Sequence, residues 1–268
     1  MLILLPFLII GVGVSTGICS AAGYTGVLLP VMLVLFFLAA VAAAMAVTVL
    51  ILWVVSLFID MEKPQETQPR FFLAIVNWVL GLITLLSRVR LHVSGMEQIP
   101  EGRWLLVSNH RSNYDPIVTG WAFRKYGLAF VSKPENLRRP IVGKLIHKIA
   151  YLPIDRENDR AALRTILTAA ERIRAGSMSY CIYPEGTRHP AEEMLPFRCG
   201  AFKIAQKAGV PIVVLAVRGT DDVHKNFPWR ATDVYLDVCG VLSADTVKAA
   251  KTTEIGEVVR QCIISANT

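Results

Sequence analysis

The first 59 residues of the chain lack aspartate, glutamate, lysine and arginine altogether, and the first charged side chain belongs to Asp60. All 28 basic and 21 acidic residues lie in the remainder, which therefore carries the whole formal net charge of +7. The apolar content of 53% thus averages a lipid-compatible segment and a strongly basic globular domain. A basic domain tied to a hydrophobic anchor indicates an anionic partner such as lipid headgroups or phosphorylated substrates, and no motif supports nucleic acid.

The uncharged segment contains two apolar runs, 2–22 and 27–59, separated by a Gly-Tyr-Thr-Gly turn. About 20 apolar residues cross the hydrocarbon core as a helix, so we expect a helical hairpin that spans the membrane or is embedded in it. A cleaved signal peptide would start with a positive region and have a much shorter apolar stretch. A buried helix pair would need a far larger soluble protein around it. The arginines after the second run, which favour a cytoplasmic domain at an inner or plasma membrane, are Arg70, Arg88 and Arg90.

Cysteine is also scarce, with five scattered residues and no CxxC pair. This pattern indicates neither a disulfide framework nor a zinc site, and a reducing cytosol fits it. A GxSxG nucleophile elbow is missing as well, so we expect neither a metal nor a covalent serine intermediate.

Three parts follow one another along the chain. The membrane hairpin occupies 1–59, and a linker with a third, amphipathic helix occupies 60–88. The linker itself is the polar, two-proline stretch 61–69, and the helix over 71–87 lies either at the membrane surface or on the domain. The third part is a catalytic domain over 89–268.

Short β-branched runs alternate with helical segments from Arg88 onward, which predicts an α/β domain. We expect a single mixed sheet of about seven strands flanked by helices. The expected strands are 89–93, 104–108, 128–132, 151–154, 178–183, 212–217 and 234–238. The expected helices are 116–125, 140–149, 160–175 and 201–208.

His110 and Asp115 stand five residues apart, just after an expected strand. Residues at that spacing differ by about 140° on a helix, and on a strand they face opposite ways, so the two side chains can meet only on a loop. Asp115 followed by a proline predicts a helix N-cap, and its second oxygen could accept from His110 Nδ1–H. The Nε2 atom would then be free to take a proton. Alternatively, Asp115 is only a cap and His110 only a loop residue.

A second motif, Tyr183-Pro184-Glu185-Gly186-Thr187-Arg188, ends another expected strand. It combines a carboxylate, a tight glycine turn with free N–H groups, and a guanidinium that could grip phosphate. The alternative is a local Glu185–Arg188 ion pair.

Several motifs occur in an order that resembles a known family. The residues Asn109, His110, Ser112 and Asp115 match an NHxSxxD motif, and 184–188 match PEGTR. Looser matches are the strand motif at 210–213, the Ile154-Asp155-Arg156 stretch and the FKxG-like element at 197–200. Over about 90–220 the chain resembles the membrane-associated glycerolipid acyltransferases, close to those acting on 1-acylglycerol 3-phosphate.

This resemblance implies transfer of a fatty acyl group from an acyl thioester to the free hydroxyl of lysophosphatidate, giving phosphatidate. His110 would be the general base and Asp115 its orienter. Arg156 and Arg188 would hold the acceptor phosphate, Glu185 would accept from an acceptor hydroxyl or brace an arginine, and N–H groups near Gly186 would stabilise the oxyanion. The implied substrate-binding residues are Arg156, Glu185, Gly186, Thr187 and Arg188.

The partners implied are membrane lipids, lysophosphatidate and a donor, either acyl-CoA or acyl-carrier protein, with no further cofactor. A basic region could meet headgroups or the donor's phosphates, or form a solvated helix face; it comprises Lys133, Arg138, Arg139, Lys144, His147 and Lys148. Three departures from the family pattern leave acceptor preference open: His189, Arg198 and Val214.

Other functions remain open at this point. The acceptor could be glycerol 3-phosphate or another lysophospholipid. The chain could also be a lipid hydrolase, or a non-catalytic module that binds anionic lipids, although binding alone does not need a positioned base.

Overall fold

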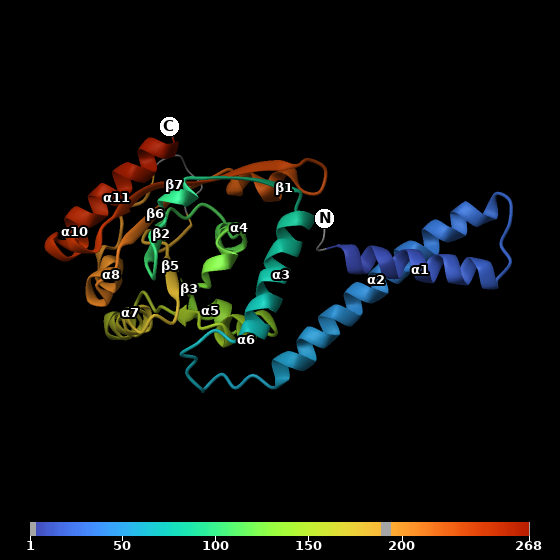
Figure 1. The fold of residues 1–268 in the computed structure, drawn as a ribbon, viewed down its shortest axis with the longest axis horizontal. Coiled ribbons are helices and arrows are strands. Elements are labelled where there is room, and N and C mark those ends of the chain that lie inside the picture. Colours follow the sequence, from blue (N-terminus) through green and yellow to red (C-terminus); the bar gives the residue numbers. More distant parts are fainter. Residues whose placement is uncertain (1–3, 189–193, 268) are drawn as a thin grey trace. The chain divides into compact units, whose positions relative to one another are not determined.

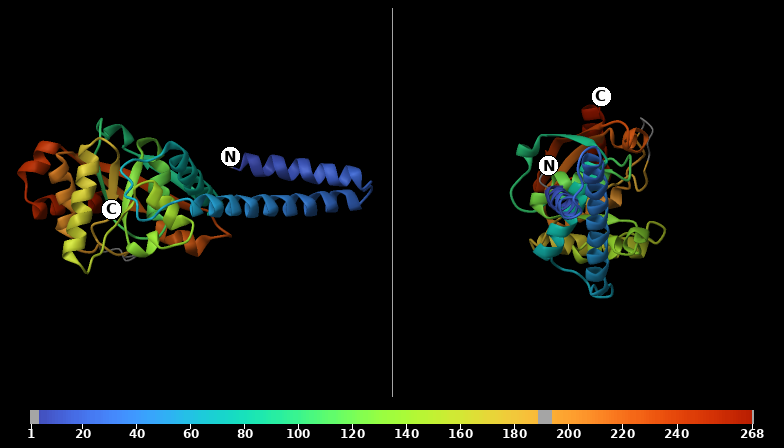
Figure 2. Two further views of the ribbon diagram at one scale, coloured as in Figure 1. Left: turned by 90° about the horizontal axis from the view of Figure 1, so that it is seen from below. Right: turned by 90° about the vertical axis from the view of Figure 1, so that its right-hand side faces the viewer.

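The computed structural model describes residues 4–188 and 194–267, and the chain divides into two compact units, Met1–Asp60 and Met61–Thr268. The first unit is a pair of helices, α1 (Leu5–Ala21) and α2 (Leu28–Leu57), lying side by side (Figure 2). A Cβ at Gly11 would lie 2.6 Å from the Phe37 ring, so glycine permits their close approach.

The α2 helix has 30 residues, and the most apolar part of it is entirely unburied. It is long and apolar enough to cross a membrane, whereas α1 is shorter. The expected helical hairpin is thus present, and of the helices in the described chain α2 alone meets the length criterion for a span.

The second unit contains one seven-stranded mixed sheet in the order β1-β7-β6-β2-β5-β3-β4 (Figure 1). Every neighbouring pair is parallel except β6 with β7. The strands are β1 (Val89–Ser94), β2 (Leu105–Ser108), β3 (Leu128–Ser132), β4 (Leu152–Pro153), β5 (Ser179–Ile182), β6 (Ile212–Arg218) and β7 (Thr232–Leu242). The predicted α/β class and the number of strands are therefore confirmed.

The expected strand over 234–238 is too short, because β7 runs on to pair with both β1 and β6. The exposed Asp233 hides the start of this strand in the sequence. At the far edge, β4 has only two residues and pairs with β3 alone.

The third helix, α3 (Arg70–Leu86), packs on the domain rather than lying free of it. It contacts α4 (Asp115–Ala122), where a Cβ at Gly120 would lie 2.8 Å from Leu80 of α3.

The other helices are α5 (Pro134–Leu137), α6 (Val142–Lys148), α7 (Asp159–Arg174), α8 (Lys203–Ala208), α9 (Val223–Asn226), α10 (Ala244–Ala249) and α11 (Thr252–Asn267). The short 3-10 turns are η1 (Met96–Gln98), η2 (Arg124–Tyr126), η3 (Cys199–Phe202) and η4 (Thr220–Asp222).

The α11 helix was not expected from the sequence. Its buried residues Ile255, Val259 and Ile263 recur every four positions and face β6 and η3. In Figure 1 this helix covers the end of the domain opposite α3.

The central strands β2 and β5 are fully buried and parallel. Parallel strands bring their carboxyl ends to one edge of the sheet, which is where ligands bind in such folds. The two polar motifs follow β2 and β5 directly, so the sheet brings both loops to the same place.

Candidate active site

The loop after β2 is pinned to the neighbouring strand by Asn109. Its amide nitrogen donates to the Val217 carbonyl at 2.8 Å, and its amide oxygen accepts from the Val217 N–H at 2.8 Å. Because both ends of the amide bond the backbone of β6, the residue that follows, His110, has a fixed starting position.

His110 and Asp115 meet across this loop, with Nδ1 2.8 Å from Oδ2. The Asp115 side chain is fully buried and accepts three further hydrogen bonds. Its Oδ2 accepts from the N–H groups of Arg111 at 2.7 Å and Ser112 at 2.8 Å, and its Oδ1 accepts from Thr220 Oγ1 at 2.5 Å. Four donors thus hold the carboxylate as an acceptor, which favours the tautomer with the proton on Nδ1 and leaves Nε2 to act as a base.

Asp115 is not the N-cap that the sequence predicted. Tyr114 occupies the cap position, and Asp115 is the first residue of α4. Its carboxylate turns back over the loop and binds N–H groups that precede the helix instead of the amides of the first turn. The expected sharing of one carboxylate between a cap and a histidine is therefore wrong.

The loops after β2 and β5 are joined by the buried Glu185. One oxygen accepts from the His110 backbone N–H at 2.7 Å, and the other accepts from the Leu195 N–H at 3.2 Å. The Tyr183 ring stacks on the His110 ring with centroids 4.4 Å apart. The Tyr183 ring of the second motif and the Asp115 carboxylate of the first therefore both hold the imidazole, while Glu185 holds the His110 backbone.

Gly186 forms the turn after β5 with a left-handed φ of 76°. Its N–H donates to the Tyr183 carbonyl at 3.1 Å, so this group closes the turn. The exposed Arg188 donates to Asn113 Oδ1, which links the second motif to the first. His189, one of the three departures from the family pattern, lies outside the described residues.

Arg198 lies between Arg156 and the second motif and contacts both. The Arg198 guanidinium donates to the Arg156 carbonyl at 3.2 Å and lies against Gly186, where a Cβ would be 2.9 Å from Nε. The buried Nη1 of Arg156 has no hydrogen-bond partner among the described residues. Burial, and then the positive charge of Arg198, lower the pKa of Arg156. The Arg198 guanidinium thus lies against the backbone of Arg156 and its charge acts on the Arg156 side chain, so a bound anion would stabilise both residues.

Arg111 was not predicted to matter, yet it forms a two-point ion pair with Asp221 of η4 at 3.2 Å. The hydrogen bond to Asp221 raises the pKa of Arg111. Burial tends to raise the pKa of Asp221, but the Arg111 hydrogen bond and charge outweigh it, so that pKa lies below its usual value. Neither Asp221 nor Thr220 gives a signal in the sequence, because each lies more than 100 residues from its partner.

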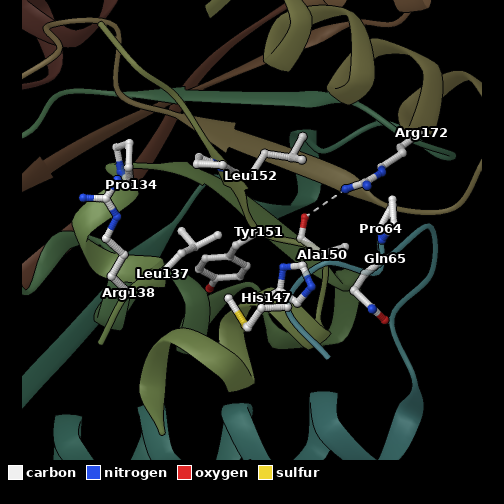
Figure 3. Close-up of a pocket in the computed structure, with 12 residues that line it drawn as sticks. Pro64, Gln65, Pro134, Leu137, Arg138, His147, Ala150, Tyr151, Leu152 and Arg172 are labelled. Atoms are coloured by element: carbon white, nitrogen blue, oxygen red, sulfur yellow. Dashed lines mark hydrogen bonds between the residues drawn. The ribbon is translucent and has the colours of Figure 1, made fainter. Parts of the chain in front are cut away.

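Part of the basic region holds the linker. His147 Nε2 lies 3.1 Å from the Lys63 carbonyl, and Lys148 Nζ donates to Gln65 Oε1 at 3.1 Å. Arg138 and His147 also help to line a cavity of about 420 Å³ with an apolar floor that includes Tyr151 (Figure 3).

Aromatic side chains run from this cavity towards the loops after β2 and β5. Tyr151 packs on Phe130 with centroids 5.2 Å apart, Phe130 lies 6.3 Å from Tyr183, and Tyr183 stacks on His110. Among residues 4–188 and 194–267, no group of His, Cys, Asp and Glu side chains is arranged to hold a metal ion.

Comparison with known proteins points to one family. The acyltransferase family model matches residues 90–218. A probable 1-acyl-sn-glycerol-3-phosphate acyltransferase from Mycoplasma pneumoniae is 30% identical over 192 residues, which cover 69% of this chain and 71% of that protein. A 1-acyl-sn-glycerol-3-phosphate acyltransferase from Haemophilus influenzae is 26% identical over 188 residues, 70% of this chain and 77% of that protein.

A solved structure shares the fold. The crystal structure of the 1-acyl-sn-glycerophosphate acyltransferase PlsC from Thermotoga maritima superposes with a TM-score of 0.55 at 23% identity. The match covers 71% of this chain and 79% of that one.

Proposed function

The chain belongs to the acyltransferase family, and from that premise we propose that it moves a fatty acyl group from an acyl thioester to the free hydroxyl of lysophosphatidate, giving phosphatidate. The observation that carries this proposal is the His110 imidazole, whose Nδ1 is held by a buried carboxylate while Nε2 remains for the substrate. A lipid-binding module would not need this arrangement.

The reaction follows from that geometry. His110 Nε2 takes the proton of the acceptor hydroxyl as its oxygen attacks the thioester carbonyl. The tetrahedral intermediate then collapses, the carbon–sulfur bond breaks, and the imidazolium returns its proton to the leaving thiolate. Asp115 fixes the tautomer and stabilises the imidazolium. Base catalysis of this kind contributes about 10² to 10⁴ in rate, so positioning and charge stabilisation supply the rest.

Arginines would hold the acceptor phosphate. Arg156 and Arg198 are adjacent, and the buried Nη1 of Arg156 has no partner in the described part of the chain. Arg188 is exposed beside the loop that carries His110 and could contribute a third guanidinium. The N–H of Thr187, next in the glycine turn, is the candidate oxyanion donor, since the Gly186 N–H is already used. Glu185 keeps both loops in register by binding their backbone.

The membrane helix fits the proposed substrates. The α2 helix can cross a bilayer, and both the acceptor and the acyl chain are lipids. The arginines that follow α2 favour a catalytic domain on the cytoplasmic side of an inner or plasma membrane. The donor would be acyl-CoA or acyl-carrier protein, and the mechanism needs no other cofactor.

The test uses the purified full chain in detergent with a palmitoyl thioester of CoA or of acyl-carrier protein. Lysophosphatidate, glycerol 3-phosphate and lysophosphatidylcholine are supplied separately, and both free thiol and lipid product are measured. We expect thiol release that depends on lysophosphatidate and matches phosphatidate formation one for one. Thiol release without an acceptor would indicate a hydrolase, and preference for glycerol 3-phosphate would replace the proposed acceptor.

A further inference from the structure

The loop between α9 and β7 displays two aromatic side chains to solvent. Phe227 is 48% exposed and Trp229 is 85% exposed. A single exposed apolar residue is ordinary, but two large exposed aromatics within three residues of one loop suit an interaction surface. We call residues 227–230, Phe-Pro-Trp-Arg, the aromatic loop.

The structure holds this loop in place. The Phe227 N–H donates to the Val223 carbonyl at 3.0 Å, and the Arg230 N–H donates to the Asn226 carbonyl at 2.8 Å. From the other side, the Arg88 guanidinium donates to the carbonyls of Pro228 at 3.1 Å and Trp229 at 3.3 Å. Because hydrogen bonds hold the backbone of the loop from both sides, the loop conformation that exposes the two aromatic side chains is fixed.

Apolar side chains and two arginines lie next to the loop. Arg88 lies two residues beyond the end of α3, whose last two residues, Leu85 and Leu86, are also exposed. Figure 1 shows the chain entering β7 beside the end of α3 where β1 begins, in agreement with the pairing of Val89 with Thr232. Arg230 is exposed at the loop itself. Aromatic rings flanked by guanidiniums suit the boundary between lipid headgroups and acyl chains.

We propose that the aromatic loop inserts into the headgroup region of an anionic phospholipid bilayer, as a membrane contact separate from the α1–α2 hairpin. A bilayer is the occupant that fits because α2 can cross one, so the domain is tethered next to that surface. The second unit is also basic, which favours anionic lipids.

This contact lies on the same segment as two residues of the active site. The η4 turn, whose Thr220 bonds Asp115 and whose Asp221 pairs with Arg111, continues directly into α9 and the aromatic loop. Insertion of the loop would therefore set the distance between the lipid surface and His110. Only this consequence rests on the proposed function, since the contact itself does not require catalysis.

The test follows the emission of Trp229 in the full chain, reconstituted in vesicles of phosphatidylcholine and phosphatidylglycerol. Subtracting the spectrum of Trp229→Phe from that of the unsubstituted chain isolates this residue from the other tryptophans. We expect the difference emission to be blue-shifted, to be mostly lost when the lipids are brominated, and to resist an aqueous quencher. In vesicles of phosphatidylcholine alone the shift should be smaller.

A matched control places tryptophan where no bilayer contact is expected. Val258 is 55% exposed on α11, and Figure 1 shows this helix at the end of the domain opposite α3. Val258→Trp in the Trp229→Phe background therefore reports a solvent-exposed ring. A Trp229 emission that matches this control, with no quenching by brominated lipid, would overturn the proposal. Equal quenching of both probes would also overturn it, because the contact would not be specific to the loop. Neither reading depends on enzyme activity.

Discussion

The guanidinium of Arg111 and the carboxylate of Asp221 meet at two points, Nε to Oδ1 and Nη2 to Oδ2, each 3.2 Å long. This pair joins the loop after β2 to the η4 turn after β6. Both side chains are partly shielded from solvent, and the pair lies directly beside the Asp115 carboxylate because the Arg111 N–H donates to it. The pair therefore positions the loop that carries His110 without touching the reacting atoms.

Asp221→Asn should destabilise the fold at neutral pH by about 1 kcal/mol, allowing for solvent screening of a partly exposed pair. A carboxyl whose folded pKa is lowered stabilises the protein above its unfolded pKa of about 3.9, and the benefit is lost as the pH falls through the folded value. Urea unfolding of both proteins at pH 7 and at acidic pH checks this. The difference should disappear in acid, and a difference that persists there would exclude the ion pair as its cause.

Gly186→Ala should impair both stability and activity. Its left-handed φ disfavours a side chain by about 1 kcal/mol, and the new Cβ would also meet the Arg198 guanidinium at 2.9 Å. Gly209→Ala is the matched control, since Gly209 has a φ of 70° but open space around it. We expect similar backbone strain in both variants and a loss of acyl transfer only in Gly186→Ala, measured by thermal unfolding and by thiol release. Equal activity of the two variants would argue against an Arg198 role.

Glu185→Gln should weaken the link between the two loops. One oxygen would become an NH₂ group facing a backbone N–H, which leaves a buried donor unpaired at a cost of about 1 to 3 kcal/mol. The free energy of unfolding should fall by that amount, and kcat should fall more than the KM for the acceptor rises. A large rise in KM with unchanged stability would mean that Glu185 binds substrate directly.

Arg198→Gln should separate phosphate binding from stability. Removing this charge relieves repulsion of the partly buried Arg156, so the free energy of unfolding should stay the same or rise slightly. The KM for lysophosphatidate should increase about tenfold or more, because a charged hydrogen bond contributes about 1.5 to 3 kcal/mol, while the KM for the thioester should not change. Arg124→Gln, in an exposed turn, is the control. A KM unaffected by Arg198→Gln would remove this residue from the phosphate site.

The sequence predicted most of the sheet because its strands are apolar runs with clear ends, such as Leu128–Ser132. It also predicted that the His110 and Asp115 side chains meet across the turn after β2, and they do, although Asp115 itself is the first residue of α4. Their partners Thr220 and Asp221 could not be predicted, because only the pairing of β2 with β6 brings them to the site. Local sequence does not determine the order of strands in a sheet. The cap assigned to Asp115 was wrong for a related reason: local sequence favours a cap, but the amides of Arg111 and Ser112 in the preceding loop bind the carboxylate instead.

The most direct test of the account is the rate of acyl transfer to lysophosphatidate by His110→Ala, measured as phosphatidate formed per enzyme in detergent. The variant keeps the Asp115 contacts to Arg111, Ser112 and Thr220, so its folding can be verified by its unfolding midpoint. We predict a loss of about 10²-fold or more, the usual contribution of a positioned base. A folded His110→Ala protein that forms phosphatidate within a few-fold of the unsubstituted rate would contradict the central claim.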